Sequence, residues 1–224
     1  MADPKKAKEE VVRIGYWKIR GLVSPIHYIC EYLSVPYERV DYEQGDDLSR
    51  EVWLSVKHSL GLDFPNLPYL IHGNVKLTES LAILRYICST YGPELLGNNP
   101  RDAAVAEMIY GVVHDIKNPI TSICYGSGDR AAAAKLVLER MPKVATFMKD
   151  RKFVVGDYPT FVDFYLFEQE ELFDWISEGK LFQEMPVLKE HHDRVAALPK
   201  FAKFLNSPRF MARPYNNKSA MLNN

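Results

Sequence analysis

The pattern of apolar residues changes at Gly97, and this change constrains the fold more than any other feature of the chain. Before Gly97, short strand-like runs alternate with helical stretches, whereas after Pro100 long helical patterns follow one another. The residues Gly97, Asn98, Asn99 and Pro100 are typical of a loop. A change from mixed to all-helical patterning across such a loop indicates a domain boundary. A length of 224 residues is sufficient for two domains of roughly 100 residues each.

The first part of the chain predicts a β-α-β unit. Residues 11–15 form a short run typical of a strand, and residues 37–42 alternate as a second one. Between them, Ser24 and Pro25 offer an N-cap and a proline in the first helical turn, and apolar residues follow at helical spacing. Because a helix connects the two strands, we expect them to be parallel.

After the second strand, the pattern predicts a loop, a hairpin and a helix. Residues 53–57 indicate a single helical turn; a strand is the alternative, but the run is short and no turn precedes it. Residues 68–71 and 75–78 flank a turn-forming His-Gly-Asn triplet. A helix follows from Ser80 and ends at the glycine-proline pair at 92–93. The expected order is therefore β-α-β, a loop helix and β-β-α.

The second part of the chain predicts helices, and two prolines interrupt the pattern. Thr160 and Asp163 resemble a capping box, so this acid starts a helix and has no catalytic role. Pro119 and Pro142 each remove a hydrogen bond and crowd the preceding turn at a cost of about 3 kcal/mol, so we expect a kink or break at each. The four expected helices cover residues 101–125, 130–151, 161–177 and 187–198. The expected domains are residues 11–92 and 101–224, joined by a linker at 93–100.

Composition and charge exclude several classes of protein. Apolar residues make up 47% of the chain, charged residues 25%, and the formal net charge is -1, which gives no strong attraction to nucleic acid or anionic membranes. Residues 1–10, MADPKKAKEE, lack the apolar core of a signal peptide and are expected to be a disordered extension. No apolar run reaches the roughly 20 residues of a membrane helix. We therefore expect a soluble, cytoplasmic protein.

Cysteine and histidine spacing predicts neither disulfides nor a metal site. Cys30, Cys88 and Cys124 are far apart and placed on apolar helical stripes, which is typical of buried thiols in a reducing compartment. None of the six histidines shares a helix face with a second one beside a carboxylate, and the adjacent His191 and His192 point apart. We predict no metal.

Three segments together resemble the mu class of glutathione transferases. They read GYWKIRGL at 15–22, LGLDFPNLPY at 60–69 and TESLAILRYI at 78–87. The sequences SPRF at 207–210 and RP at 213–214 resemble the tail of the same class. The family implies a thioredoxin-like α/β domain followed by an all-α domain, the division reached above. It also implies a cytosolic homodimer that conjugates glutathione, as co-substrate, to apolar electrophiles without a tightly bound cofactor.

The resemblance implies a role for each matching residue. Tyr16 aligns with the catalytic tyrosine that ionises the thiol. The glutathione-binding positions are Tyr16, Trp17, Arg50, Trp53, Lys57, Asn66, Leu67, Glu79 and Ser80, with Asp115 supplied by the partner subunit. The electrophile is expected to contact Ile19, Leu22, Tyr125 and Met211. Phe64 resembles the aromatic key that enters a pocket of the partner, although it could equally pack in its own subunit.

The chemistry of these residues suits an anionic tripeptide. A free thiol has a pKa of about 8.5, and the thiolate is the nucleophile. A tyrosine hydroxyl donating to sulfur favours the anion; lowering the pKa by ~2 units requires about 2.7 kcal/mol, within reach of a hydrogen bond to a charged group. Lys57 and Arg50 can meet the glycine carboxylate, and Ser80 with the following N–H groups can hold the γ-glutamyl carboxylate. Taken alone, each residue has an ordinary structural explanation; their joint spacing favours the site.

The sequence departs from the class pattern at one position of the glutathione site and at one position near the electrophile pocket. Glu79 stands where the mu class usually has Gln, and Pro119 falls between Asp115 and Tyr125, where a kink would change the electrophile pocket. The resemblance also implies a cis bond before Pro68, although most such bonds are trans. The sequence leaves open a glutathione-dependent isomerase or peroxidase, and a non-catalytic ligand-binding member of the fold.

Overall fold

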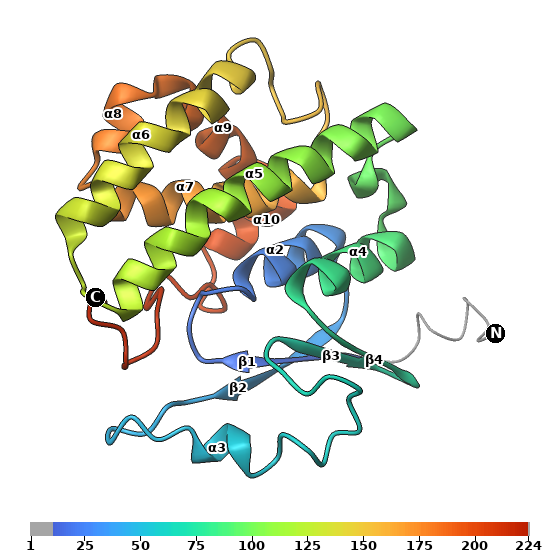
Figure 1. Cartoon of the computed structure of the whole chain (residues 1–224). Helices are drawn as coiled ribbons and strands as arrows, with labels where there is room; N and C mark the ends of the chain where they lie inside the picture. Colours follow the sequence, from blue (N-terminus) through green and yellow to red (C-terminus); the bar gives the residue numbers. More distant parts are fainter. Residues whose placement is uncertain (1–10, 224) are drawn as a thin grey trace. The chain divides into compact units, whose positions relative to one another are not determined.

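The computed structural model describes residues 11–223, which form two compact units (Figure 1). The first unit runs to Pro93 and also includes Met211–Ser219, and the second comprises Glu94–Phe210 and the residues from Ala220 onward. The expected extension at 1–10 lies outside the described residues. The expected helical domain included the whole tail, so the grouping of Met211–Ser219 with the first unit changes that boundary. Backbone hydrogen bonds from the loop after the first strand to the tail account for the change.

A four-stranded mixed sheet lies at the centre of the first unit, with the strand order β2-β1-β3-β4. The strands are β1 (Val12–Trp17), β2 (Tyr37–Tyr42), β3 (Tyr69–His72) and β4 (Val75–Thr78). β1 and β2 are parallel, whereas β3 is antiparallel to both β1 and β4. The expected parallel pair and hairpin are confirmed. The hairpin turn is only Gly73 and Asn74, because His72 pairs with Val75 inside the sheet.

Two helices, α2 (Ser24–Leu33) and α4 (Ser80–Tyr91), cover one face of this sheet (Figure 1). Their apolar residues Ile26, Ile29 and Ile83 are fully buried, as are Ile14 and Leu70 of the sheet. These side chains of the helices and the sheet form the core of the unit. Their burial stabilises the fold by about 25 cal/mol for each Å² of apolar surface removed from water.

Two helix starts in the first unit differ from expectation, and strands β1 and β3 are shifted by one or two residues from the expected 11–15 and 68–71. The short helix α3 (Glu51–Leu54) begins two residues before the expected turn at 53–57. Ser24 is the first residue of α2 instead of its N-cap, and the N-cap, Val23, makes no side-chain capping bond. Backbone N–H groups of Ile26 and His27 bond to the Val23 carbonyl, so the turn closes without a side-chain acceptor.

The second unit is helical, and among the described residues it contains two short helices that the sequence pattern missed. The helices are α5 (Pro100–Tyr125), α6 (Arg130–Met148), α7 (Phe161–Ile176), α8 (Lys180–Glu184), α9 (Pro186–Ala196) and α10 (Pro199–Leu205), and the 3-10 turn η1 (Pro93–Leu96) precedes them. Helices α8 and α10 were not expected, because five and seven residues are too short for a helical period to stand out. No helix in residues 11–223 is long and apolar enough to cross a membrane.

The two internal prolines do not break their helices. Helix α5 continues through Pro119 and α6 through Pro142, so of the expected kink or break the break is excluded, and a kink stays a prediction. In α5, the buried residues Ile116, Ile120 and Cys124 lie on both sides of Pro119. Their packing on each side maintains the helix against the loss of one hydrogen bond, about 3 kcal/mol.

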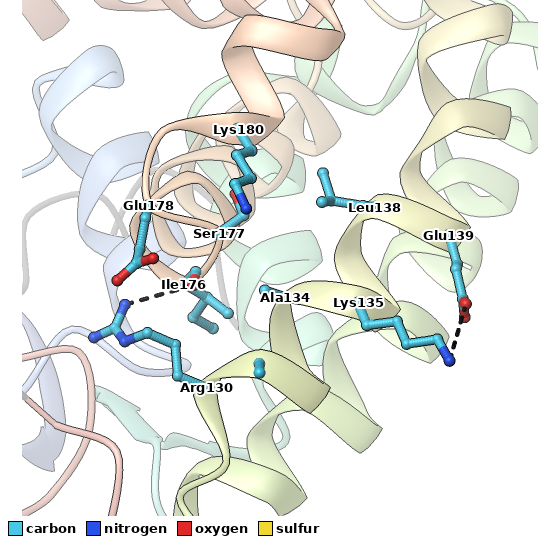
Figure 2. A pocket seen from close by; sticks show the side chains of 10 residues that line it. Arg130, Ala134, Lys135, Leu138, Glu139, Ile176, Ser177, Glu178 and Lys180 are labelled. Carbon is cyan, nitrogen blue, oxygen red and sulfur yellow. Dashed lines mark hydrogen bonds and ion pairs between the residues drawn. The ribbon is translucent and has the colours of Figure 1, made fainter.

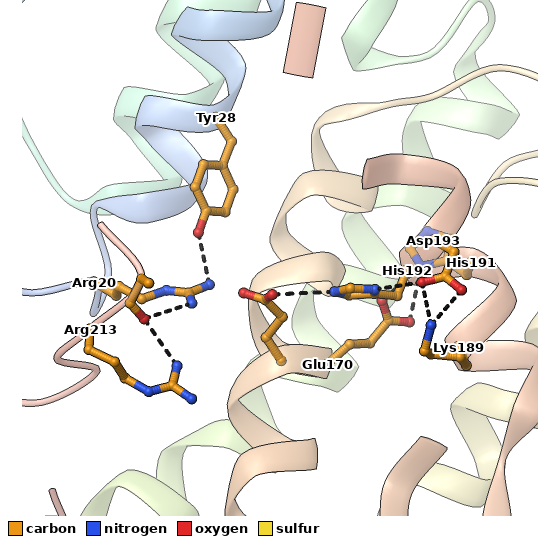
Figure 3. A network of polar contacts seen from close by, with 10 residues as sticks. Arg20, Tyr28, Glu170, Lys189, His191, His192, Asp193 and Arg213 are labelled. Carbon is orange, nitrogen blue, oxygen red and sulfur yellow. Dashed lines mark hydrogen bonds and ion pairs between the residues drawn. The ribbon is translucent and has the colours of Figure 1, made fainter. Parts of the chain in front are cut away.

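A buried polar network joins α7 and α9 of the second unit (Figure 3). The capping box is present: Asp163 Oδ2 accepts bonds from the Thr160 backbone and hydroxyl at 2.7 and 2.9 Å. Asp163 Oδ1 lies 3.1 Å from His191 Nε2, and His191 Nδ1 lies 3.0 Å from Glu170. Burial lowers the pKa of His191, but Glu170 and Asp163 outweigh it and raise that pKa to about 10. A protonated ring then donates from both nitrogens.

Candidate functional site

The sheet brings four loop segments to one of its ends. Trp17, the last residue of β1, pairs with Tyr42, the last residue of the parallel strand β2. Tyr69, the first residue of β3, pairs with Gly15 and with Thr78, the last residue of β4. The segments after β1, after β2, before β3 and after β4 therefore start from the same end of the sheet. Most of the predicted glutathione residues belong to these segments.

Tyr16 lies near this end of β1 with a buried ring and a hydroxyl that meets the following loop. The ring is 8% exposed, and the hydroxyl oxygen accepts a hydrogen bond from the Leu22 backbone N–H at 3.2 Å. An N–H that donates to a hydroxyl oxygen makes that hydroxyl a stronger donor in turn, because neighbouring hydrogen bonds polarise one another. The bond from Leu22 therefore fixes the Tyr16 hydroxyl in place and makes it a stronger hydrogen-bond donor.

Glycines on both sides of Tyr16 allow this close packing. A Cβ at Gly21, where φ is +43°, would lie 2.8 Å from the Tyr16 hydroxyl. A Cβ at Gly15 would lie 2.1 Å from the Tyr69 ring. Any side chain at Gly21 would push the loop away from the hydroxyl, and one at Gly15 would move β1 off the ring. Both glycines are required by geometry.

An aromatic cluster supports α3 beneath this end of the sheet. The Trp53 ring centroid lies 5.3 Å from that of Tyr42 and 6.1 Å from that of Tyr69, and Trp53 is 5% exposed. The Tyr42 and Tyr69 hydroxyls are 3.0 Å apart. Burial, together with this bond, raises the pKa of Tyr69 well above its ordinary value. The sequence interpretation missed Tyr42 and Tyr69, whose positions at paired strand ends were the available signal.

The backbone before β3 leaves polar groups available. The peptide bond between Leu67 and Pro68 is cis, as the resemblance implied. Leu67 is buried, yet its N–H and C=O make no hydrogen bond to any residue in the described range 11–223. Buried backbone groups are nearly always paired. Leu67 therefore presents a donor and an acceptor that suit a peptide ligand.

The start of α4 has an unusual backbone conformation. Glu79, the N-cap, has φ +69° and ψ 114°, a region that costs a non-glycine residue about 1–3 kcal/mol. Glu79 and Ser80 make no side-chain hydrogen bond or ion pair within the part of the chain that the structure describes. The same holds, within that part, for the side chains of Arg50, Lys57 and Asn66. These polar groups suit a ligand rather than the fold itself.

Comparison with known proteins finds the family that the sequence motifs resemble, over nearly the whole chain. Residues 12–89 match the glutathione S-transferase N-terminal domain, and residues 114–208 match the C-terminal domain. The chain is 35% identical over 211 residues to the class-mu 26 kDa isozyme 51 of Fasciola hepatica, with 92% of this chain and 93% of the relative covered. It belongs to the glutathione S-transferase family.

Other relatives and solved structures agree. Glutathione S-transferase Mu 3 of Homo sapiens is 36% identical over 225 residues, with 96% of this chain and 97% of the relative covered. The crystal structure of the glutathione S-transferase Blo t 8 has a TM-score of 0.85 and 26% identity, covering 93% of this chain and 98% of that one. The first unit is thus the thioredoxin-like domain of this transferase, and the second its helical domain.

The remaining predicted residues of the transferase lie on several elements. Asp115 and Tyr125 are exposed residues of α5 in the second unit, and Tyr125 ends that helix. Ile19 is 5% exposed, and Leu22 and Met211 are half-buried. Trp17 is half-buried at the end of β1. Their contacts with a ligand, and that of Asp115 with a second subunit, stay predictions.

A groove in the second unit is lined by other residues. It has a volume of about 580 Å³ and is formed by α6 with the segment 176–180 (Figure 2). Lys135 pairs with Glu139 at its rim, and the Arg130 guanidinium donates to the Trp175 carbonyl at 2.7 Å. None of the predicted site residues lines it. Its charges are of both signs, Lys135 is paired with Glu139, and this mixture indicates no particular ligand.

Proposed function

We propose that this transferase binds glutathione at the end of the sheet in its first unit, and that Tyr16 stabilises the thiolate for attack on apolar electrophiles. The observation that supports this most is the Tyr16 hydroxyl, buried at the sheet end and accepting from Leu22 N–H at 3.2 Å. The same hydroxyl has a proton that it can donate to a sulfur atom. Its bond strengthens as negative charge develops there, so it favours the thiolate over the thiol.

The available polar groups match glutathione part by part. Leu67 N–H and C=O can pair with the cysteinyl unit, as neighbouring strands do. Ser80 and the N–H groups at the start of α4 can bind the γ-glutamyl carboxylate, and Glu79 with the partner's Asp115 can accept from the ammonium. Lys57 and Arg50 can bind the glycine carboxylate. Trp17, Trp53 and Asn66 complete the proposed set.

The proposal also covers the electrophile and a second subunit. We infer that Ile19, Leu22, Tyr125 and Met211 contact the apolar electrophile, with Tyr125 able to donate to a developing oxyanion. Phe64 is 79% exposed, which is unusual for so large an apolar side chain and suits an aromatic key in a homodimer.

We place the enzyme in the cytoplasm, because Cys30, Cys88 and Cys124 are all buried free thiols. Glutathione acts as a co-substrate, and no tightly bound cofactor is needed for this chemistry.

Substitution of Tyr16 by Phe tests the mechanism. The ring still packs, so glutathione affinity should change little, whereas the thiol pKa in the complex should rise by about 2 units toward its free value. Thiolate absorbance of bound glutathione, titrated against pH, measures it, and an unchanged pKa would remove Tyr16 from this role. Turnover of 1-chloro-2,4-dinitrobenzene by the wild type is the companion assay; retention on immobilised glutathione without turnover would indicate a carrier instead.

A further inference from the structure

The loop that meets the Tyr16 hydroxyl is fastened on its other side to the tail. This loop, residues 18–23, carries the Leu22 N–H that donates to Tyr16. In the same loop, Arg20 N–H donates to the Pro214 carbonyl at 2.9 Å and Gly21 N–H to the Tyr215 carbonyl at 3.2 Å. Two consecutive N–H groups thus bind the tail, and the next one in sequence, that of Leu22, binds Tyr16. A shift of the tail contact would move the Leu22 donor.

The Arg20 side chain reinforces this attachment from inside the unit (Figure 3). Arg20 is 1% exposed. Its guanidinium donates to the Tyr28 hydroxyl at 2.9 Å and to the Ala212 carbonyl at 3.3 Å. It also lies 4.6 Å from the centre of the Tyr215 ring, a cation–π contact. One buried side chain therefore connects helix α2, the loop and the tail.

The tail is also held at the segment after β2. Ser219 N–H donates to Gln44 Oε1 at 3.1 Å, and Gln44, itself 5% exposed, donates to the Leu48 carbonyl at 2.8 Å. Lys218 lies 2.7 Å from Asp46. The segment Met211–Ser219 thus runs between two of the loops that leave the same end of the sheet. Being held at both, it provides a fixed support for the loop that carries Leu22.

We propose that Arg20 is a positioning residue for thiol activation: by fastening residues 18–23 to the tail, it keeps the Leu22 N–H on the Tyr16 hydroxyl oxygen. This inference rests on the proposed role of Tyr16. Because Arg20 is 1% exposed, its effect on the thiol is exerted through the loop. Its loss lets the loop relax outward, so the hydroxyl loses its polarising donor and becomes a weaker hydrogen-bond donor to sulfur.

The test uses the full chain and compares Arg20→Lys with Arg213→Lys. Lysine keeps the positive charge, but it lacks the planar guanidinium that donates to both the Tyr28 hydroxyl and the Ala212 carbonyl. Arg213 is the matched control, because it also donates to the Ala212 carbonyl and lies 4.2 Å from the Tyr215 ring centre, but from the exposed side and outside the loop. Thiolate absorbance against pH gives the pKa of bound glutathione. S-methylglutathione, which has no thiol proton, reports binding alone.

We expect Arg20→Lys to raise the pKa of the bound thiol by about half a unit or more, which is roughly threefold less thiolate below that pKa. Affinity for S-methylglutathione should stay within about twofold, and Arg213→Lys should leave the thiol pKa unchanged. Tyr28→Phe removes one acceptor of the guanidinium and should shift the thiol pKa in the same direction by less. If Arg20→Lys does not fold, the thiol pKa of Tyr28→Phe alone tests the positioning role of Arg20.

The outcomes separate this inference from the proposed function. If Tyr16→Phe raises the thiol pKa but neither Arg20→Lys nor Tyr28→Phe does, Arg20 only supports the fold and the positioning role is refuted. The same conclusion follows if Arg20→Lys and Arg213→Lys give equal shifts, because the charge near the ring would then account for both. If Tyr16→Phe itself has no effect on the thiol pKa, the proposed function fails.

Discussion

Two polar regions of the molecule differ in how far the fold itself satisfies them. At the sheet end of the first unit, the side chains of Arg50, Lys57 and Ser80 make no hydrogen bond or ion pair to any described residue. In the second unit, both ring nitrogens of His191 are hydrogen-bonded to carboxylates. The first region also includes the strained backbone of Glu79. In the second, Asp163 accepts from the backbone and hydroxyl of Thr160 and from Val154 N–H. Polar groups left unsatisfied by the fold suit a ligand, while fully satisfied buried groups contribute to stability. Substitutions in the two regions should therefore affect different measurements.

The largest expected effect is on stability, from His191→Ala. Removing the ring leaves the Glu170 and Asp163 carboxylates facing each other without their shared donor, which should lower the free energy of unfolding by about 3–5 kcal/mol. Urea denaturation measures it. Lys189→Ala, which breaks the exposed ion pair to Asp193 on the same helix, is the control and should cost about 0.2–1 kcal/mol. Equal effects would mean that burial of the network is unimportant.

The same network should give the unfolding free energy a pH dependence. The pKa of His191 in the folded chain, about 10, is higher than that of an unfolded histidine, so its protonation favours the folded state. This contribution is complete below the unfolded value, about 6.5, and is lost as the pH rises through the folded value. Denaturation from pH 6 to 10 should show a decline that is absent in His191→Gln. Parallel profiles for the two proteins would contradict it.

Phe64→Ser should weaken association instead of the fold. Phe64 is 79% exposed in the single chain, so its loss costs the subunit little, whereas an aromatic at an interface hot spot can contribute about 2 kcal/mol or more. Sedimentation at micromolar concentration should show more monomer, and activity should fall with it if Asp115 acts across the dimer. Leu54→Ser, at another exposed apolar residue of the same unit, is the control. A dimer as tight as wild type would show that Phe64 has no interface role.

Glu79→Gly should have the smallest and most diagnostic effect, since it separates stability from binding. Glycine relieves the positive φ, which should raise the free energy of unfolding by about 1 kcal/mol, while glutathione affinity falls because the acceptor for the ammonium is lost. Glu79→Gln keeps an acceptor and should bind nearly as wild type. Glu178→Gly, at an exposed positive-φ residue of the second unit, should affect stability without affecting binding. Unchanged affinity in Glu79→Gly would make Glu79 only a helix-start acid.

Local patterns in the sequence determined the elements and the family. The alternation at 37–42, the helical spacing after Ser24 and the Thr160 to Asp163 capping box each depend on residues within one turn or strand, so they can be read without knowing the fold. The motifs at 15–22, 60–69 and 78–87 indicated the glutathione transferase family and Tyr16 with it. These features survive in the structure with small shifts at their ends.

Contacts between distant segments were decided only by the tertiary structure. The sequence predicted a catalytic role for Tyr16, but it indicated neither the Leu22 N–H that donates to its hydroxyl nor the tail carbonyls that fasten the loop. It treated His191 only as a poor metal ligand, and the network with Asp163 and Glu170 depends on α9 meeting α7. It allowed a break at each helix proline as an alternative to a kink, because propensity counts the lost hydrogen bond and not the packing on either side. The packing of separate elements decides which buried groups come into contact. The periodicity of a single element carries no information about that packing.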